Sequence, residues 1–405
     1  MDNESKKKIG IGVAITAGIV LLFFVGKWFI TRQAGEPTTT AGNDEKKVEQ
    51  AQFSLHALCR YADSVGIDTA RYSVKPTSTD AEIDDKRADL LMEIRYGKKP
   101  SRLTFSGLKE KVDSAWAPKA DATDMVESVA KLTTFGPYNQ LVGHYNRIRR
   151  GGRSNSLTAD TLRLIRQTLN FYRYTNRFDA DQFVVVNIPA AELNVFDRKG
   201  TRLLPMDVIV GKPDRQTPCM TTYVQNVVAY PYWNVPRKIA LEEVLPRMQK
   251  NIAYVYNQNF QIIDEKEQEV DPEEVDWNSL SATNFPYRIR QASGCENSLG
   301  LLKFVLANPL AIYLHDTNSR DLFTQSANRW RSHGCVRVQK PVELANLVLG
   351  AKTFTPDFMN KCLIDQKPRQ LDIPKKFPVF IAYNIADVDA GGKLTFYKDV
   401  YSLDK

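Results

Sequence analysis

Histidine and cysteine are both scarce in this chain, with only 4 and 5 copies among 405 residues. No CxxC pair and no HExxH stretch is present, which excludes the ligand spacings most typical of structural zinc sites and zinc peptidases. Despite this scarcity, the stretch WRSHGCVRV (residues 330–338) places His333 and Cys335 two residues apart. Three interpretations compete for it: a metal site, a catalytic thiol, or an ordinary buried strand.

The sequence also lacks any block of basic residues interleaved with aromatic residues. The net charge is +8, but the lysines and arginines behind it are scattered. This pattern predicts no nucleic-acid partner. A mildly basic surface suits an acidic polymer as substrate, although most such charge is expected to be solvated surface.

A long apolar run lies near the start of the chain. Between Lys8 and Lys27 the only polar residue is Thr16, and about 20 apolar residues suffice to span a bilayer. A cleaved signal peptide is the alternative, but its apolar core is usually about 7–15 residues long, and TRQAGEP is a poor cleavage site. We therefore predict a cytoplasmic tail (1–8), a transmembrane anchor (9–30), a flexible linker (31–50) and export of everything that follows.

Export matters for the cysteines, because oxidising compartments favour disulfides. An odd number of cysteines leaves at least one thiol free, and Cys335 is the candidate. The pairing of the other four remains open: Cys59, Cys219, Cys295 and Cys362.

The chain after the linker changes character near Asp179. In TLRLIRQTLNFYRY, apolar residues recur at spacings of three and four, which predicts an amphipathic helix within a helical scaffold domain at 51–178. From 179 onward, β-branched runs around the DRKG turn predict strands and hairpins. The helix-like and acidic residues 237–285 interrupt this β region and are expected to form a lid.

Residues 371–405 are expected to add a C-terminal β segment to this organisation. The predicted fold class is therefore α+β. It combines an N-terminal transmembrane helix, the helical scaffold and a mostly β domain at 179–370 that carries the inserted lid.

A nucleophilic thiol at Cys335 needs a base that takes its proton. A histidine two residues away can rarely direct its ring at the thiol, whereas His315, at the end of the extended run AIYLHD, can lie across a sheet from it. Gly334 allows a tight turn that brings backbone N–H groups close to a developing oxyanion. A zinc set of His315, Asp316, His333 and Cys335, and a merely buried thiol, are the alternatives.

A histidine, sixteen intervening residues and then Ser-His-Gly-Cys resemble the motif of the L,D-transpeptidase catalytic domain, also called the YkuD fold. The stretches VIVGKPDRQTP, YPYWNVPRKIA, VDWNSL, NSLGLLKFVLANPLAIYLHDT and SHGCVRV further resemble, in order, blocks of its large, membrane-anchored YcbB-like subgroup. The resemblance is strong over about 180–350 and weaker elsewhere. Large members often carry a peptidoglycan-binding module in the helical scaffold, and this sequence leaves no room for one.

The resemblance implies a role for each residue of the motif. Cys335 is expected to be the acyl-enzyme nucleophile and His315 its base, oriented by the carbonyl group of Asp316. The expected oxyanion donors and pocket residues are the backbone around His333, Gly334 and Cys335, with Ser332, Tyr313, Arg337 and Trp233 lining the cleft. A structural ion pair for Arg337 and a core position for Trp233 remain as alternatives.

The reaction implied by the resemblance is peptidoglycan cross-linking. The thiolate attacks the third residue of a tetrapeptide stem, releases D-Ala, and passes the acyl group to a neighbouring stem as a 3→3 cross-link. No metal and no organic cofactor is expected, and carbapenems are expected covalent inhibitors. An L,D-carboxypeptidase that resolves the same thioester with water and a non-catalytic cell-wall scaffold are the alternatives. The implied location is the bacterial inner membrane, with the catalytic domain in the periplasm.

Overall fold

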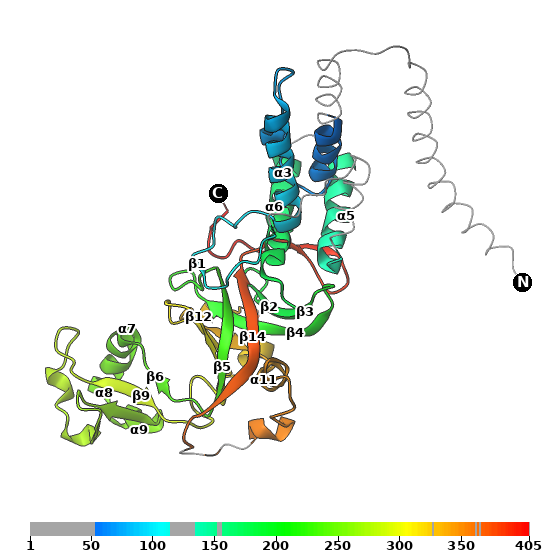
Figure 1. The fold of residues 1–405 in the computed structure, drawn as a ribbon. Helices are drawn as coiled ribbons and strands as arrows, with labels where there is room; N and C mark the ends of the chain where they lie inside the picture. Colours follow the sequence, from blue (N-terminus) through cyan, green and yellow to red (C-terminus); the bar gives the residue numbers. More distant parts are fainter. Residues whose placement is uncertain are drawn as a thin grey trace, which may run out of the picture.

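The computed structural model describes residues 53–404, except 114–133, 152–155, 326–327, 361–362 and 364–365. A helical region and a β region lie one above the other, and a smaller insertion projects from the β region (Figure 1). The predicted tail, anchor and linker all lie outside the described residues.

The helical region confirms the amphipathic pattern of the sequence. It contains helical residues 53–64, α3 (Asp80–Tyr96), α5 (Gly136–Gly151) and α6 (Ser156–Thr175), with a 3-10 turn at each of η1 (Ala70–Tyr72) and η2 (Asn176–Phe178). Thr79 and Glu82 start α3 with a capping box, in which each side chain accepts a hydrogen bond from the other's backbone N–H. The apolar faces of these helices meet in one buried cluster that includes Leu58, Leu90 and Leu169.

The β region is built on one large sheet. Its strands follow the order β1-β5-β10-β11-β13-β4-β3-β2-β14, and β14 also pairs with β5, so the sheet closes on itself. β12 pairs with β4 beside the main path. The strands are β1 (Phe105–Ser106), β2 (Gln182–Asn187), β3 (Glu192–Asp197), β4 (Arg202–Gly211), β5 (Met220–Ala229), β10 (Leu302–Leu306), β11 (Tyr313–His315), β12 (Trp330–Ser332), β13 (Val336–Val338) and β14 (Arg369–Ala382).

The DRKG turn forms where the sequence predicts it. Asp197 Oδ1 accepts hydrogen bonds from the backbone N–H groups of Lys199 and Thr201, both at 2.8 Å. Gly200 has φ +82°, a left-handed conformation that favours glycine. The turn therefore joins β3 to β4 and sets their antiparallel register.

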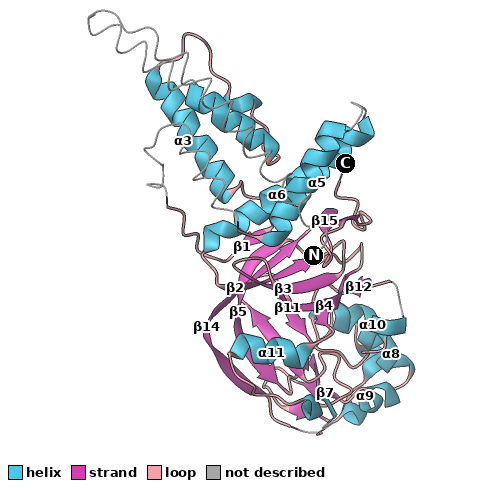
Figure 2. Cartoon of the chain, turned by 90° about the vertical axis from the view of Figure 1, so that its right-hand side faces the viewer, coloured by secondary structure: helices cyan, strands magenta, loops and turns pink. Residues whose placement is uncertain are grey.

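One face of the sheet is covered by α11 (Pro341–Leu349), whose buried residues join the core of the β region. The short elements α10 (Leu322–Gln325) and η6 (Pro356–Asn360) complete this part of the chain. Figure 2 shows α11 lying across the strands, below the helical region.

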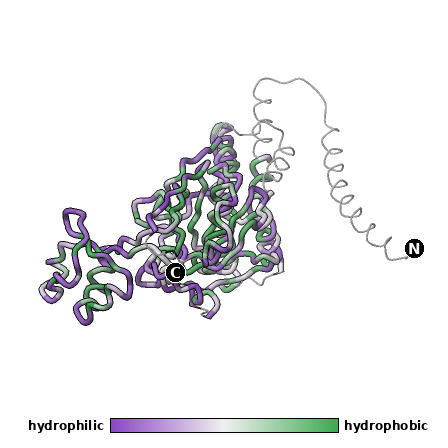
Figure 3. Tube along the Cα trace, turned by 90° about the horizontal axis from the view of Figure 1, so that it is seen from below, coloured by the Kyte–Doolittle hydropathy of each residue, from purple (hydrophilic) through white to green (hydrophobic). Residues whose placement is uncertain are grey.

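The insertion, residues 233–291, has a core of its own, to which Met248, Val255 and Ile262 contribute. Its strands form a separate sheet in the order β6-β9-β7-β8. Seen from below, it extends away from the rest of the chain (Figure 3). Its elements are β6 (Trp233–Asn234), α7 (Arg237–Ile239), the π-helical turn η3 (Ala240–Val244), α8 (Leu245–Lys250), α9 (Ala253–Asn257), β7 (Phe260–Ile263), β8 (Glu269–Val270), η4 (Pro272–Glu274), η5 (Trp277–Ser279) and β9 (Arg288–Gln291).

The C-terminal part of the chain links the two regions. β14 pairs with both β2 and β5, so the boundary expected at residue 370 falls inside a strand of the main sheet. The hairpin of β15 (Ala386–Val388) and β16 (Leu394–Phe396) then packs against the helices (Figure 2). There Thr168 Oγ1 on α6 donates a hydrogen bond of 2.5 Å to the Ala386 carbonyl.

The predicted fold class needs one correction. Its α+β character and its mostly β domain with an insertion are found, but no helix in the described part of the chain is long and apolar enough to cross a membrane. The transmembrane helix is therefore wrong as a component of the described fold. It was inferred from an apolar run at 9–30, which lies outside the described residues.

A buried carboxylate at the junction of the hairpin and α6 predicts a pH-dependent stability. Tyr172 OH donates to both carboxylate oxygens of Asp387 at 2.8 and 2.9 Å, and burial raises the pKa of Asp387 to about 6. Because the folded-state pKa exceeds the unfolded value, this group lowers stability as pH rises from about 4 through 6. The Asp387→Asn variant cannot ionise, so its free energy of unfolding should not fall in this way. The difference in unfolding free energy between the variant and wild type should therefore increase by about 2 kcal/mol from pH 4 to pH 7. Urea unfolding at both pH values measures this gain, and a difference independent of pH would contradict the assignment.

Candidate active site

Cys335 lies in a three-residue turn between two strands of the sheet. β12 ends at Ser332, β13 begins at Val336, and both strands pair with β4. Gly334 within this turn has φ +115°, which L side chains rarely adopt. The tight turn predicted for this glycine is therefore confirmed.

Ser332 ties the turn together from within. Its hydroxyl donates a 2.6 Å hydrogen bond to the Cys335 carbonyl and accepts one of 3.2 Å from the Gly334 N–H. The side chain is 3% exposed. Ser332 therefore shapes the turn rather than facing an open cleft.

His315 lies on the strand next to Cys335. β11 runs parallel to β13, with Leu314 paired with Val336 and His315 with Arg337. His315 Nδ1 donates a hydrogen bond of 2.5 Å to the Asp316 carbonyl, which leaves Nε2 as the proton acceptor. Burial, followed by the Arg337 charge, lowers the pKa of His315 to about 3. The ring is therefore neutral at pH 7.

The Asp316 carboxylate anchors the peptide that orients His315. Its oxygens accept hydrogen bonds from Leu301 N–H at 2.8 Å and from Arg320 Nε and Nη2 at 3.1 and 2.7 Å. Gly300 has φ +61°, and a Cβ atom there would lie 2.1 Å from Asp316 Oδ2. Only glycine therefore lets the loop before β10 approach this carboxylate.

The Cys335 thiol lies in a partly apolar environment with weak polar contacts. Its sulfur donates to the Ala311 carbonyl at 3.6 Å. Burial raises the pKa of Cys335, while hydrogen bonds with Tyr313 and the charge of Lys303 work in the opposite direction. The resting thiol is therefore protonated at pH 7.

Tyr313 connects the thiol to the insertion. Burial, and then its interactions with Cys335, raise the pKa of Tyr313 well above its usual range, while a hydrogen bond with the Trp233 side chain lowers it. Lys303 Nζ lies 4.1 Å from the centre of the Tyr313 ring. Trp233, at the start of the insertion, also packs against Phe260 in the insertion core.

Arg337 is a half-buried cation beside His315. Its Nη1 donates to Thr317 Oγ1 at 3.4 Å. Burial, and then the charge of Arg331, lower its pKa from the usual value. No carboxylate of the described residues forms an ion pair with Arg337, so the alternative of a structural ion pair is not observed.

His333 turns toward the insertion. Its Nε2 lies 2.8 Å from Glu243 Oε1, and Glu243 also pairs with Arg215 at 3.3 Å. Arg215 forms a second ion pair with Glu242 at 2.5 Å. The imidazole is therefore engaged by the insertion, and the contribution of His333 to the turn is its backbone.

The structure brings the predicted site residues together around one turn. His333, Gly334 and Cys335 form the turn, and Ser332 ends the strand before it. His315 and Tyr313 come from the next strand, and Trp233 interacts with Tyr313. Sequence reasoning missed Lys303, Arg320 and Arg215. Of these three, only Lys303 had a signal in the sequence, because it is a charged residue within the extended apolar run LLKFVL. In the structure it lies opposite His315 in the β10–β11 register.

Two other observations bear on the remaining alternatives. Cys59, Cys219 and Cys335 are free thiols and Cys295 is disulfide-bonded, so the expected free thiol at Cys335 is confirmed. In the described part of the chain no three His, Cys, Asp or Glu residues gather in a way that could hold a metal ion. A cavity of about 690 Å³ lies between the helices and the sheet, but none of the predicted site residues lines it.

Comparison with known proteins agrees with the motif. Residues 181–381 match the model of the L,D-transpeptidase catalytic domain, YkuD. A curated Haemophilus influenzae protein, provisionally named an L,D-transpeptidase, is 38% identical over 222 residues, which cover 55% of this chain and 44% of that protein. This chain thus matches less than half the length of that relative, and the matches do not test the membrane-anchored subgroup.

Solved structures with detectable similarity include two L,D-transpeptidases. The catalytic domain of the E. faecium enzyme, acylated by ertapenem, is 11% identical with a TM-score of 0.24, covering 50% of this chain and 97% of that one. L,D-transpeptidase 1 of Mycobacterium tuberculosis is 14% identical with a TM-score of 0.19, covering 50% and 61%. Scores this low add nothing to the assignment, which rests on the family model and the curated relative. Residues 181–381 therefore form an L,D-transpeptidase catalytic domain of the YkuD type.

Proposed function

We propose that this protein forms 3→3 cross-links between peptidoglycan stem peptides through a thioester on Cys335. The observation that carries the proposal is the hydrogen bond from His315 Nδ1 to the Asp316 carbonyl, 2.5 Å long. It holds the neutral imidazole in the tautomer whose Nε2 can accept a proton. A neutral base on the strand next to that of a protonated thiol supports general-base activation.

In the first half of the reaction, Nε2 of His315 takes the thiol proton as Sγ of Cys335 bonds to the carbonyl carbon of stem residue three. The oxyanion is held by backbone N–H groups of the 333–335 turn. Because the Gly334 N–H already donates to Ser332 Oγ, the His333 and Cys335 N–H groups are the donors that we assign to it. The C–N bond to the terminal D-Ala then breaks, and its amine leaves with the proton from His315.

In the second half, an amine of a neighbouring stem attacks the thioester carbonyl. His315 takes a proton from that amine and returns it to the leaving thiolate of Cys335, which restores the resting pair. Arg337 is a half-buried cation with no carboxylate partner among the described residues. We assign it to a carboxylate of the bound stem.

The first test is the product of the reaction. The full-length protein, mixed with purified disaccharide-tetrapeptide, should give a dimer that has lost one D-Ala, detected by mass spectrometry. Cys335→Ala should give none, because no thioester can form. Cys59→Ser, which changes a free thiol in the helical region, is the matched control and should behave as wild type. Tripeptide alone would favour the L,D-carboxypeptidase, and unchanged tetrapeptide would contradict both activities.

The second test separates the two histidines near the thiol. His315→Asn should slow acylation of Cys335 by a carbapenem roughly 10²–10⁴-fold, because the general base is lost. His333→Ala should slow it less than about 10-fold, because that ring contacts Glu243 rather than the thiol. Stopped-flow absorbance gives both rates, and equal thermal unfolding midpoints confirm folding. The reverse order would show that the base has been assigned wrongly.

The third test concerns the acid side of the pH profile. The Arg337 charge helps to lower the pKa of His315, so Arg337→Gln should raise that pKa. The pH below which His315 becomes protonated and acylation slows should then rise relative to wild type. Because the pKa of His315 is about 3 in wild type, carbapenem acylation rates are measured from pH 2.5 to pH 8, each normalised to the variant's own maximum. An acid limb that stays in place or moves to lower pH would contradict the electrostatic coupling.

A further inference from the structure

Two hydroxyl groups outside the motif hold the turn that carries Cys335. Thr217 Oγ1 donates a hydrogen bond of 2.7 Å to the Gly334 carbonyl and accepts one of 2.9 Å from Gly211 N–H. Tyr401 OH donates to the Gly211 carbonyl at 2.5 Å and accepts from Thr217 N–H at 3.2 Å. Thr217 and Tyr401 are 2% and 6% exposed, so water does not compete for these bonds.

The loop between Gly211 and Thr217 packs directly on the turn. A Cβ atom on Gly334 would lie 3.6 Å from the Gln216 carbonyl oxygen, and one on Gly211 would lie 2.2 Å from the Arg215 carbonyl oxygen. The loop is thus closed tightly on itself, with the hydroxyl of Tyr401 bridging its two ends. Its position therefore depends on Tyr401.

The bond from Thr217 acts on a peptide group that matters for the reaction. The Gly334 carbonyl and the Cys335 N–H belong to one planar, trans peptide, so they point in opposite directions. A hydroxyl that fixes the carbonyl direction therefore also fixes the direction of the N–H. That N–H is one of the two donors assigned to the oxyanion.

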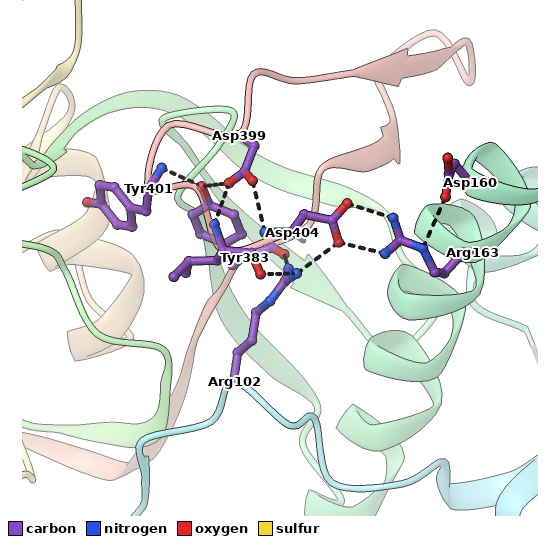
Figure 4. Close-up of polar contacts among 8 residues, drawn as sticks. Arg102, Asp160, Arg163, Tyr383, Asp399, Tyr401 and Asp404 are labelled. Atoms are coloured by element: carbon purple, nitrogen blue, oxygen red, sulfur yellow. Dashed lines mark hydrogen bonds and ion pairs between the residues drawn. The ribbon is translucent and has the colours of Figure 1, made fainter. Parts of the chain in front are cut away.

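Tyr401 is itself held by a network that reaches the helical region (Figure 4). Its backbone N–H donates to Tyr383 OH at 2.7 Å, and the two rings stack with centres 5.5 Å apart. Tyr383 OH in turn donates to Asp399 Oδ1 at 2.5 Å. The side chain of Asp399 also accepts the backbone N–H groups of Leu403 and Asp404, at 3.0 and 2.9 Å.

Asp404 anchors this segment to the helices. Its carboxylate receives Arg163 Nη1 and Nη2 at 2.7 and 2.8 Å, a bidentate pair from α6, and Arg102 Nη2 at 3.0 Å. Arg163 also pairs with Asp160 at 3.6 Å (Figure 4). A continuous set of bonds thus runs from α6 through residues 399–404 to the loop behind Cys335.

We propose that Tyr401 is a positioning residue for acyl transfer, which acts through Thr217 to aim the Cys335 N–H at the oxyanion. This inference rests on the proposed function, because it assumes that Cys335 is acylated. Residues 399–404, which lie outside the Ser-His-Gly-Cys motif, would then contribute to acyl transfer by holding Tyr401 in place. Tyr401 contacts Gly211, Thr217 and Tyr383, and in this proposal it acts on Cys335 only through them.

The test compares two reactions of the same thiol. Carbapenem acylation passes through an oxyanion, whereas alkylation by iodoacetamide does not. Tyr401→Phe keeps the ring that stacks on Tyr383 and removes the hydroxyl. In the full-length protein it should lower the acylation rate constant at saturating carbapenem roughly 10- to 100-fold. The apparent dissociation constant and the iodoacetamide rate at Cys335, located by peptide mass spectrometry, should change less than about twofold.

Three further variants separate positioning from general damage. Thr217→Val should lower the acylation rate as Tyr401→Phe does. Thr217→Ser, which keeps the hydroxyl, should retain most of the wild-type acylation rate. Tyr397→Phe makes the same chemical change elsewhere in the C-terminal segment and should leave both rates at the wild-type value.

Equal acylation rates in wild type and Tyr401→Phe would overturn the positioning role alone. So would parallel losses of acylation and alkylation, which would indicate a loosened site. A wild-type protein that no carbapenem acylates would remove the proposed function, and this inference with it.

Discussion

The hydrogen bond from His315 Nδ1 to the carbonyl of its own neighbour, Asp316, is the constraint on which the chemistry of the site depends. A backbone carbonyl can orient a ring only if its peptide is fixed, and here the Asp316 N–H donates to the Leu302 carbonyl at 2.8 Å. The buried Asp316 carboxylate adds bonds from Leu301 and Arg320. The close approach at Gly300 permits this arrangement. The loop before β10 thus helps to hold the imidazole that we propose as the base.

The closed sheet supplies the second constraint. Adjacent strands lie about 4.8 Å apart, and the parallel pairing of β11 with β13 puts His315 opposite Arg337, two residues after Cys335, without any loop having to place it. Burial then keeps both groups neutral, since it lowers the pKa of His315 and raises that of Cys335. In the proposed reaction, activation of the Cys335 thiol therefore comes with substrate, when the proton moves to His315 as the carbon–sulfur bond forms.

The sequence predicted those parts of the fold and site that local patterns encode. Periodicity identified α6, β-branched runs around the DRKG turn identified β3 and β4, and the spacing of His315 from Cys335 identified the motif. The domain boundary predicted at residue 370 falls inside β14. The sequence could not indicate this strand's extent, because its pairing with β2 and β5 depends on residues some 150–200 positions away. Arg320 and Thr217 escaped notice for the same reason, since an arginine or threonine has no local signature until the fold supplies its partner. The transmembrane helix was inferred from the apolar run at 9–30 and its flanking residues, and it is not part of the described fold.

The turn at Cys335 is restrained both by residues close to it in the sequence and by residues far from it. Ser332, within the motif, fixes the Cys335 carbonyl and engages the Gly334 N–H. Thr217, more than a hundred residues upstream, fixes the Gly334 carbonyl from the other side. Glu243, in the insertion, lies 2.8 Å from Nε2 of the His333 ring. Ser332 thus restrains two peptides of the turn and Thr217 a third. In the proposed reaction, an oxyanion formed at Cys335 would therefore meet a Cys335 N–H whose direction is already fixed.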